Sequence, residues 1–124
     1  TLLLPDEAEG LKAQLIRLAD GRQLNLILTT GGTGFSPRDI TPEATMAVAT
    51  RNAPGIAEAI RYHSLTITPR GMLSRGASVL RGKTLIVNLP GSPKAVREDL
   101  EYLLPSLEHG VRIAAGLDGE CARK

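Results

Sequence analysis

The chain has 124 residues and a formal net charge of +2, and 42% of its residues are hydrophobic. This length and composition suit one globular domain with a real core and exclude a disordered chain. Acidic and basic residues are mixed along the sequence, and its aromatic residues are Phe35, Tyr62 and Tyr102. We therefore expect neither a basic nucleic-acid footprint nor an aromatic surface that stacks single strands.

Cysteine use and hydropathy suggest a compartment. Cys121 is the single cysteine, so the sequence allows no internal disulfide and no cysteine-based metal site. No apolar run approaches the length that spans a bilayer. We expect a cytoplasmic protein that contacts no membrane.

The N-terminal third predicts a strand, a helix and a second strand. Residues 1–5 form a short apolar run that predicts a buried strand, and leucines at helical spacing predict a helix over residues 5–20 that Gly21 ends. Residues 24–30 form a continuous apolar run, typical of a strand covered on both faces. This order predicts a βαβ unit with parallel strands.

The middle of the chain predicts two helices. Thr41 is a good N-cap residue and Pro42 suits the first helical position, so a helix is expected over residues 41–52. A second helix is expected over residues 53–64, and Pro54 marks the break between the two helices.

The C-terminal half predicts a hairpin and a long helix. Residues 66–78 are expected to be irregular, and residues 78–90 predict two short strands with a turn near Arg81–Gly82. Residues 91–110 open a last helix, which Pro105 is expected to bend or end. The pattern predicts an α/β fold with a mixed, mostly parallel sheet.

A glycine cluster follows the second predicted strand. Gly31, Gly32 and Gly34 occupy three of four positions, where glycine allows unusual backbone angles and close approach of a ligand. Consecutive amides in such a loop form a nest for an anion such as phosphate. Hydroxyl donors come from the neighbouring threonines: Thr29, Thr30 and Thr33. A plain glycine-rich turn remains the alternative, since the spacing matches neither a Walker A loop nor a dinucleotide fingerprint.

A second turn with suitable chemistry follows the last predicted strand, in the sequence Pro90-Gly91-Ser92-Pro93-Lys94. Ser92 is placed to cap a helix whose free amides and dipole favour an anion, and Lys94 adds positive charge. An ordinary, well-capped connection is the alternative. Because ligands bind beyond the carboxyl ends of parallel strands, we expect both turns at one edge of the sheet.

Two carboxylates lie near these turns. Asp39 sits between the glycine loop and the Thr41 helix, and Asp6 follows the first predicted strand. Beside phosphate oxygens such acids bind a hard cation such as Mg²⁺. An Asx turn at Asp39 and a first-turn helix acid at Asp6 are the alternatives.

The segment from Thr68 to Gly76 carries further cations. Arg70 and Arg75, with Ser74 between them, offer a guanidinium grip for phosphate or carboxylate, and a solvated loop is the alternative. His63 and His109 lie on helical patterns, where surface or core-edge roles are favoured over catalysis.

Four blocks of this sequence resemble one known family. They are LILTTGGTGFSPRDITPEAT, PGIAEAIR, MLSRG and KTLIVNLPGSPKAVRE. Together they resemble the MogA/MoaB family of molybdenum-cofactor biosynthesis, whose eukaryotic relatives include the G domain of gephyrin. The likeness runs from Pro5 through about residue 110.

The resemblance implies a three-layer α/β domain, with helices on both faces of the sheet, that forms a homotrimer. It implies adenylylation of molybdopterin by Mg²⁺-bound ATP, with pyrophosphate released and the product passed to a molybdate-insertion protein. Asp6 and Asp39 then match the family's catalytic and metal-binding acids. Substrate contacts are implied for three motifs: Gly31-Gly32-Thr33-Gly34, Leu73-Ser74-Arg75 and Leu89-Pro90-Gly91-Ser92-Pro93.

Relatives in that family open with another strand and a Ser-Asp-Arg loop before the position of Thr1. We therefore expect a single domain over residues 1–124 that lacks this segment and belongs to a longer protein. Alternatives to the adenylyltransferase are a molybdopterin-binding or scaffolding module without turnover, a molybdate-insertion domain, and a competence-damage-type domain acting on pyridine nucleotides.

Overall fold

The structure, a computed structural model, describes residues 1–5 and 7–117; Asp6 and Cys121, both considered in the sequence analysis, lie outside the described residues. The elements follow one another in this order: α1 (Ala8–Ile16), a π-helical turn η1 (Arg17–Gly21), β1 (Leu26–Thr30), α2 (Thr41–Ala47), β2 (Arg51–Asn52), α3 (Pro54–Leu65), a 3₁₀ helix η2 (Pro69–Leu73), β3 (Ser78–Arg81), β4 (Thr84–Leu89) and α4 (Pro93–Ala114).

The sheet is mixed, as the sequence predicts. Its four described strands lie in the order β1-β4-β3-β2. β1 pairs with β4 in parallel, whereas β3 is antiparallel to both β4 and β2. Three of these strands therefore run in one direction and β3 runs against them.

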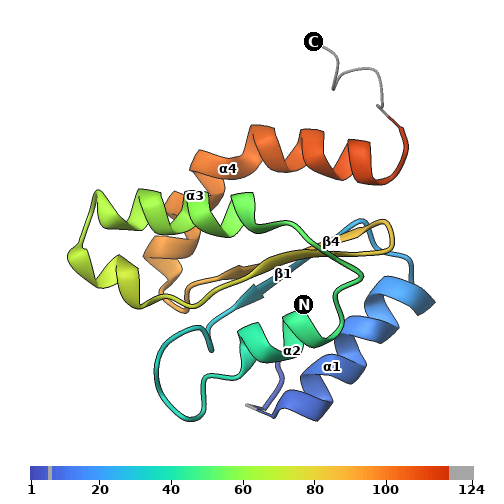
Figure 1. Cartoon of the computed structure of the whole chain (residues 1–124), viewed down its shortest axis with the longest axis horizontal. Coiled ribbons are helices and arrows are strands. Elements are labelled where there is room, and N and C mark those ends of the chain that lie inside the picture. Colours follow the sequence, from blue (N-terminus) through green and yellow to red (C-terminus); the bar gives the residue numbers. More distant parts are fainter. Residues whose placement is uncertain (6, 118–124) are drawn as a thin grey trace.

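Helices cover both faces of this sheet in three layers (Figure 1). On one face, Leu15 and Ala19 of the N-terminal helix pack with Val48, just after α2, against Ile27 and Ile86 of the sheet. On the other face, residues of α3 and α4 enclose a second apolar cluster, whose buried members are Ile60, Leu85, Val87, Leu89, Leu103 and Leu107. The expected three-layer α/β fold is confirmed.

β4 is covered on both faces, whereas β1 is not, so the expectation that the strand at residues 24–30 is covered on both faces is wrong. All six residues of β4 are buried, whereas Leu28 of β1 is 38% exposed. The reason is position: β4 lies between β1 and β3, and β1 has a neighbour on one side in the described sheet. A continuous apolar run did not distinguish a central strand from one at the edge.

Residues 1–5 form no strand, which corrects a second expectation. The segment is exposed throughout, with Leu3 at 99%, and pairs with none of the described strands. The predicted βαβ unit therefore does not form between residues 1–5 and β1. The following helix is confirmed, and its last turn ends at Gly21 as predicted.

The middle of the chain differs from expectation in its boundaries. Thr41 is the first residue of α2, and Ile40 occupies the N-cap position without a side-chain hydrogen bond. The helix ends at Ala47, before the expected residue 52, and Arg51 and Asn52 form β2, which pairs with β3. Pro54 begins α3, as predicted.

The C-terminal half follows its predicted pattern closely. β3 and β4 form the expected hairpin, with Gly82 at φ +56° in the turn. Pro105 lies inside α4 and does not end it; the helix instead changes direction near its middle (Figure 1). Bending follows because proline removes one backbone donor and crowds the preceding turn.

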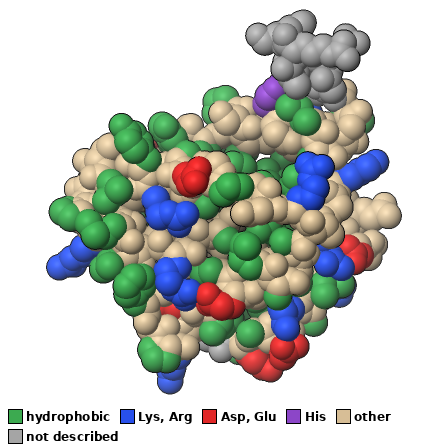
Figure 2. Space-filling model, viewed as in Figure 1, with side chains coloured by type: hydrophobic (Ala, Val, Ile, Leu, Met, Phe, Trp, Pro, Cys, Tyr) green, Lys and Arg blue, Asp and Glu red, His purple; other side chains and the backbone are tan. Residues whose placement is uncertain are grey.

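Charged and apolar side chains share the surface. On the face drawn in Figure 2, basic and acidic groups are interspersed among hydrophobic ones. Within the described ranges, 1–5 and 7–117, no helix has both the length and the apolar character needed to cross a bilayer.

One carboxylate is buried between α3 and α4. Asp99 is 2% exposed, and its Oδ1 lies 3.4 Å from Nδ1 of His63, whose ring stacks on Tyr102. No described residue forms a hydrogen bond with Oδ2. Burial raises the pKa of Asp99 above its ordinary value, and the His63 contact opposes this in part.

This raised pKa predicts a measurable pH dependence. A carboxyl group whose pKa is higher in the folded than in the unfolded state stabilises the fold at any pH below its unfolded-state pKa. This stabilisation is lost as the pH rises through the folded-state pKa. We expect the stability of the wild type relative to Asp99→Asn to fall as the pH rises above about 4, the ordinary pKa of an aspartate, until it passes the raised folded-state pKa, by about 1.4 kcal/mol for each unit of raised pKa. Urea unfolding at several pH values measures it.

His63→Gln is the companion variant. It removes the group that lowers the Asp99 pKa, so the same pH dependence should move to higher pH. Parallel pH profiles for wild type and Asp99→Asn would contradict the assignment.

Candidate functional site

The register of one strand pair brings the two predicted turns together. Thr30 at the end of β1 faces Leu89 at the end of β4, and the amide of Gly31 donates to the Leu89 carbonyl at 3.0 Å. The glycine loop therefore leaves the sheet beside the Pro90-Gly91-Ser92 turn. The prediction that both turns lie at one edge is confirmed.

Gly31 and Gly91 allow the two backbones to touch. A Cβ at Gly91 would lie 3.4 Å from Cα of Gly31, and a Cβ at Gly31 would lie 3.8 Å from Cα of Gly91. Gly31 also has φ +83°, which side chains rarely adopt. Glycine at residue 31 is therefore required by the backbone angle, and the two turns lie within van der Waals distance of each other.

Gly32 and Gly34 make room for groups from the chain that follows the loop. Gly32 has φ +71°, and a Cβ there would collide with Oγ1 of Thr41. A Cβ at Gly34 would lie 2.8 Å from Oδ2 of Asp39. The loop backbone thus lies directly against the start of α2 and against the candidate carboxylate.

Asp39 is half-buried, and one of its two carboxylate oxygens already accepts a hydrogen bond within the protein. Its Oδ2 accepts a hydrogen bond from the Ser36 amide at 2.9 Å, and its own amide donates to the Ser36 carbonyl at 2.9 Å. The turn alternative is therefore present in the structure. One carboxylate oxygen remains for a ligand. No described cluster of three His, Cys, Asp or Glu residues could hold a metal ion, and Asp6 lies outside the described part of the chain.

The start of α4 forms as predicted. Ser92 caps the helix, since its Oγ accepts the Ala95 amide at 3.4 Å, and Pro93 is the first helical residue. Lys94 is 88% exposed and 4.0 Å from Glu98. The remaining first-turn amides lie at the positive end of a 22-residue helix.

Arg75 lies beside the glycine loop, but its side chain binds the protein. The guanidinium donates to the carbonyls of Gly34 at 2.8 Å and Asp39 at 2.7 Å, and to both carboxylate oxygens of Glu43. Its amide donates to the Thr33 carbonyl at 2.7 Å. Ser74 uses Oγ to accept the Gly76 amide.

These contacts affect both partners of the Arg75–Glu43 pair. Their hydrogen bond lowers the pKa of Glu43 and raises that of Arg75, and the charge of Asp39 adds to the second shift. Glu43 was not singled out from the sequence, where it looks like an ordinary first-turn acid.

Asn88 is a second group that the sequence did not reveal as important. It is 3% exposed, and its Nδ2 donates to Oγ1 of Thr29 and of Thr45, both at 2.9 Å. Its Oδ1 accepts the Ala77 amide at 3.0 Å. The Asn88 side chain therefore links β1, α2 and the residue just before β3. A single polar residue inside an otherwise apolar buried strand was the available signal.

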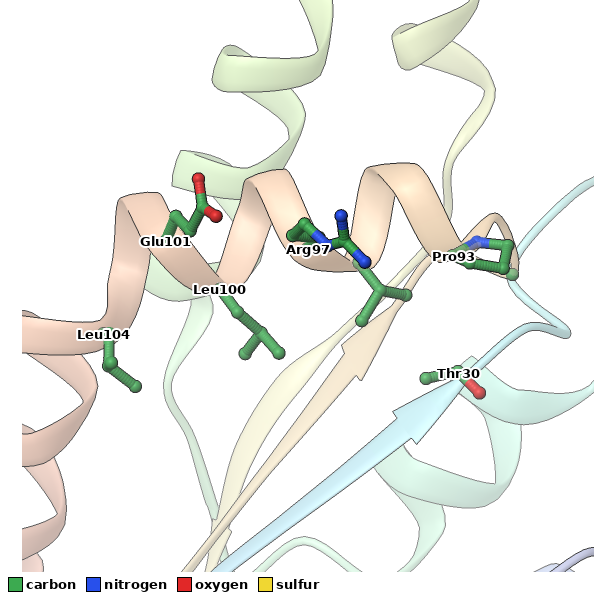
Figure 3. Close-up of a pocket in the computed structure, with 8 residues that line it drawn as sticks. Thr30, Pro93, Arg97, Leu100, Glu101 and Leu104 are labelled. Carbon is green, nitrogen blue, oxygen red and sulfur yellow. The ribbon is translucent and has the colours of Figure 1, made fainter.

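A cavity of about 550 Å³ opens beside the turns. Thr30, Gly91 and Pro93 line its end at the sheet, and residues of α4 form its wall: Val96, Arg97, Leu100, Glu101 and Leu104. Figure 3 shows Leu100 and Leu104 projecting toward the sheet. Arg97 and Glu101 were missed, since charged residues four apart look like a solvated helix face.

The remaining candidates lie elsewhere. Arg70 is exposed on η2. His63 packs between α3 and α4, as a core-edge residue, and His109 is exposed on α4.

The collision at Gly32 predicts a stability effect. Gly32→Ala should lower the free energy of unfolding by about 1–3 kcal/mol, because the residue has positive φ and its Cβ would displace Thr41. Gly110→Ala is the matched control, since a Cβ there meets nothing and alanine favours a helix interior by about 0.5–1 kcal/mol. Equal effects of the two variants in urea unfolding would contradict the loop geometry.

Solved structures share this architecture. The molybdopterin biosynthesis enzyme MoaB from Thermus thermophilus superimposes with a TM-score of 0.84 at 52% identity, covering 90% of this chain and 70% of the other.

Curated relatives and a family match agree with it. The Haemophilus influenzae and Helicobacter pylori relatives, both named molybdopterin adenylyltransferase, are 50% and 43% identical over 82% and 92% of this chain. The chain spans 51% and 65% of their respective lengths. The family described as "Probable molybdopterin binding domain" matches residues 1–109. With these matches over most of its length, the chain belongs to that molybdenum-cofactor biosynthesis family.

Proposed function

We propose that the protein is a molybdopterin adenylyltransferase, which transfers AMP from Mg²⁺-bound ATP to molybdopterin and releases pyrophosphate. One observation carries the proposal: the glycine loop, the capped start of α4 and the Asp39 carboxylate meet at one edge of the sheet. The names of the similar curated proteins support the same reaction.

The proposed reaction is a displacement at phosphorus. An oxygen of the terminal phosphate of molybdopterin attacks the α-phosphorus of ATP, and a new P–O bond forms. The bond from that phosphorus to the β-bridging oxygen breaks, and pyrophosphate leaves with the electron pair. No protein nucleophile takes part, so the residues contribute chiefly by positioning and by compensating charge.

The two turns would orient the anionic groups. Amides of residues 31–34 and of the first turn of α4 donate hydrogen bonds, and the helix dipole favours negative charge at Ser92 and Lys94. Thr30, Thr33, Ser74 and Pro90 complete the proposed substrate contacts. Both turns could bind the phosphates of ATP or the phosphate of molybdopterin, so the proposal does not specify which turn binds which substrate.

Asp39 would hold the magnesium ion, with Asp6 as the second candidate. The donor set fits, since Mg²⁺ accepts one or two carboxylates together with substrate phosphates, and Asp39 keeps one oxygen free of the Ser36 contact. When bound, the ion offsets negative charge on the phosphate oxygens. The same proposal includes a homotrimer in the cytoplasm that passes its product to a molybdate-insertion protein.

Asp39→Asn tests the carboxylate. The amide can still accept the Ser36 N–H, so the fold should persist, but loss of charge should slow pyrophosphate release from ATP and molybdopterin about 100-fold or more. Glu58→Gln, on an exposed position of α3, should leave turnover unchanged. Near-normal turnover by Asp39→Asn would remove this residue from the reaction. Binding of both substrates by the wild type without pyrophosphate release would favour the binding module.

Ser92 allows the anion site to be tested separately from the helix cap. Asparagine and aspartate both cap helices about as well as serine, so Ser92→Asn and Ser92→Asp should have similar stability. Aspartate places a negative charge where an anion is expected, so Ser92→Asp should weaken substrate binding by at least about fivefold relative to Ser92→Asn. Calorimetric titration with each substrate measures this. Equal affinities of the two variants for both substrates would exclude an anion at this turn.

A further inference from the structure

Arg75 connects the two parts of the loop at residues 31–40 that are proposed to act in the reaction, the glycine cluster and Asp39. Its Nε donates to the carbonyl of Gly34, and its Nη2 donates to the carbonyl of Asp39. One planar guanidinium therefore fixes the distance between the glycine backbone and the residue that carries the carboxylate. Residues 31–40 form no helix or strand of their own, so this connection supplies order that regular structure does not.

Glu43 holds that guanidinium from the other side. Its Oε2 lies 2.6 Å from Nη1 and its Oε1 lies 3.2 Å from Nη2, a two-pronged arrangement that fixes the plane of the arginine. Glu43 is on α2, directly after the loop. Gly34 and Asp39 of the loop, and Glu43 just after it, therefore all bind one side chain.

Arg75 is itself anchored. Arg61, on α3, donates from Nη1 to the carbonyls of Ser74 at 3.4 Å and Gly76 at 2.7 Å. These two carbonyls flank Arg75 in the chain. The guanidinium therefore extends from a backbone segment that α3 holds in place.

We propose that Arg75 and Glu43 are positioning residues for the reaction: they hold the Asp39 carboxylate against the amides of residues 31–34 and do not themselves touch substrate. The inference rests on the proposed function for the role of Asp39. It revises the sequence-based expectation for Arg75, because four hydrogen bonds of its side chain already go to Gly34, Asp39 and Glu43.

The chain contains a matched control at another place on the sheet. Arg81 forms the same kind of fork with Asp20, at 3.0 and 2.7 Å, and donates to the Val48 carbonyl at 2.9 Å. Both Arg75→Lys and Arg81→Lys keep the charge and lose the planar fork. A merely structural role predicts similar consequences for the two variants.

Two measurements on the protein test the proposal. Hydrogen–deuterium exchange of the segment 31–41 should accelerate in Arg75→Lys and Glu43→Gln and stay unchanged in Arg81→Lys. In steady-state pyrophosphate release, Arg75→Lys should lower kcat about 10- to 100-fold, the range expected for a misplaced reacting group, with KM for ATP changed less than about twofold. Glu43→Asp, which keeps the charge, should recover part of the kcat that Glu43→Gln loses.

Three results would overturn the proposal: unchanged exchange at 31–41 in Arg75→Lys, unchanged kcat in that variant, or equal losses of kcat in Arg75→Lys and Arg81→Lys. If the wild type releases no pyrophosphate, the proposed function fails. The exchange measurement then decides alone: acceleration confined to Arg75→Lys and Glu43→Gln supports positioning, and unchanged exchange overturns it.

Discussion

The pairing of β1 with β4 is the constraint on which the site depends. Because Thr30 and Leu89 end their strands at the same level, the two following turns emerge side by side without any long connection. The fully buried β4 fixes this level, since both of its faces lie in apolar clusters and a slip of one residue would turn each side chain to the other face. Near the end of β4, the side chain of Asn88 adds hydrogen bonds to Thr29 of β1 and Thr45 of α2, which also fix this register.

Most of the contacts that shape this site involve backbone groups. Main chain lies against main chain at Gly31 and Gly91, and the guanidinium of Arg75 donates hydrogen bonds to loop carbonyls. Such an arrangement suits phosphate chemistry, because amides fixed in advance compensate developing charge without reorganising. Few side chains would then be needed for the proposed reaction.

Sequence reasoning predicted the fold class, the main helices, the hairpin and the meeting of the two turns, because each has a local signal: apolar period, proline, glycine or a cap. It failed where the answer depends on distant neighbours. Nothing in residues 1–5 or 24–30 says which strands lie alongside them, so burial was overestimated in both. The contacts of Arg75 with Gly34 and Asp39 join positions far apart in sequence, and Glu43 has no local feature that separates it from other helix-start acids.

The touching backbones at Gly31 and Gly91 have a consequence for how this protein can change. A Cβ at either position would lie in van der Waals contact with the opposite turn, so the effects of substitutions at the two sites should depend on each other instead of adding. The two turns should therefore be varied together. Directed evolution of this site should randomise both segments in the same library, since a change in one turn alters the surroundings of the other.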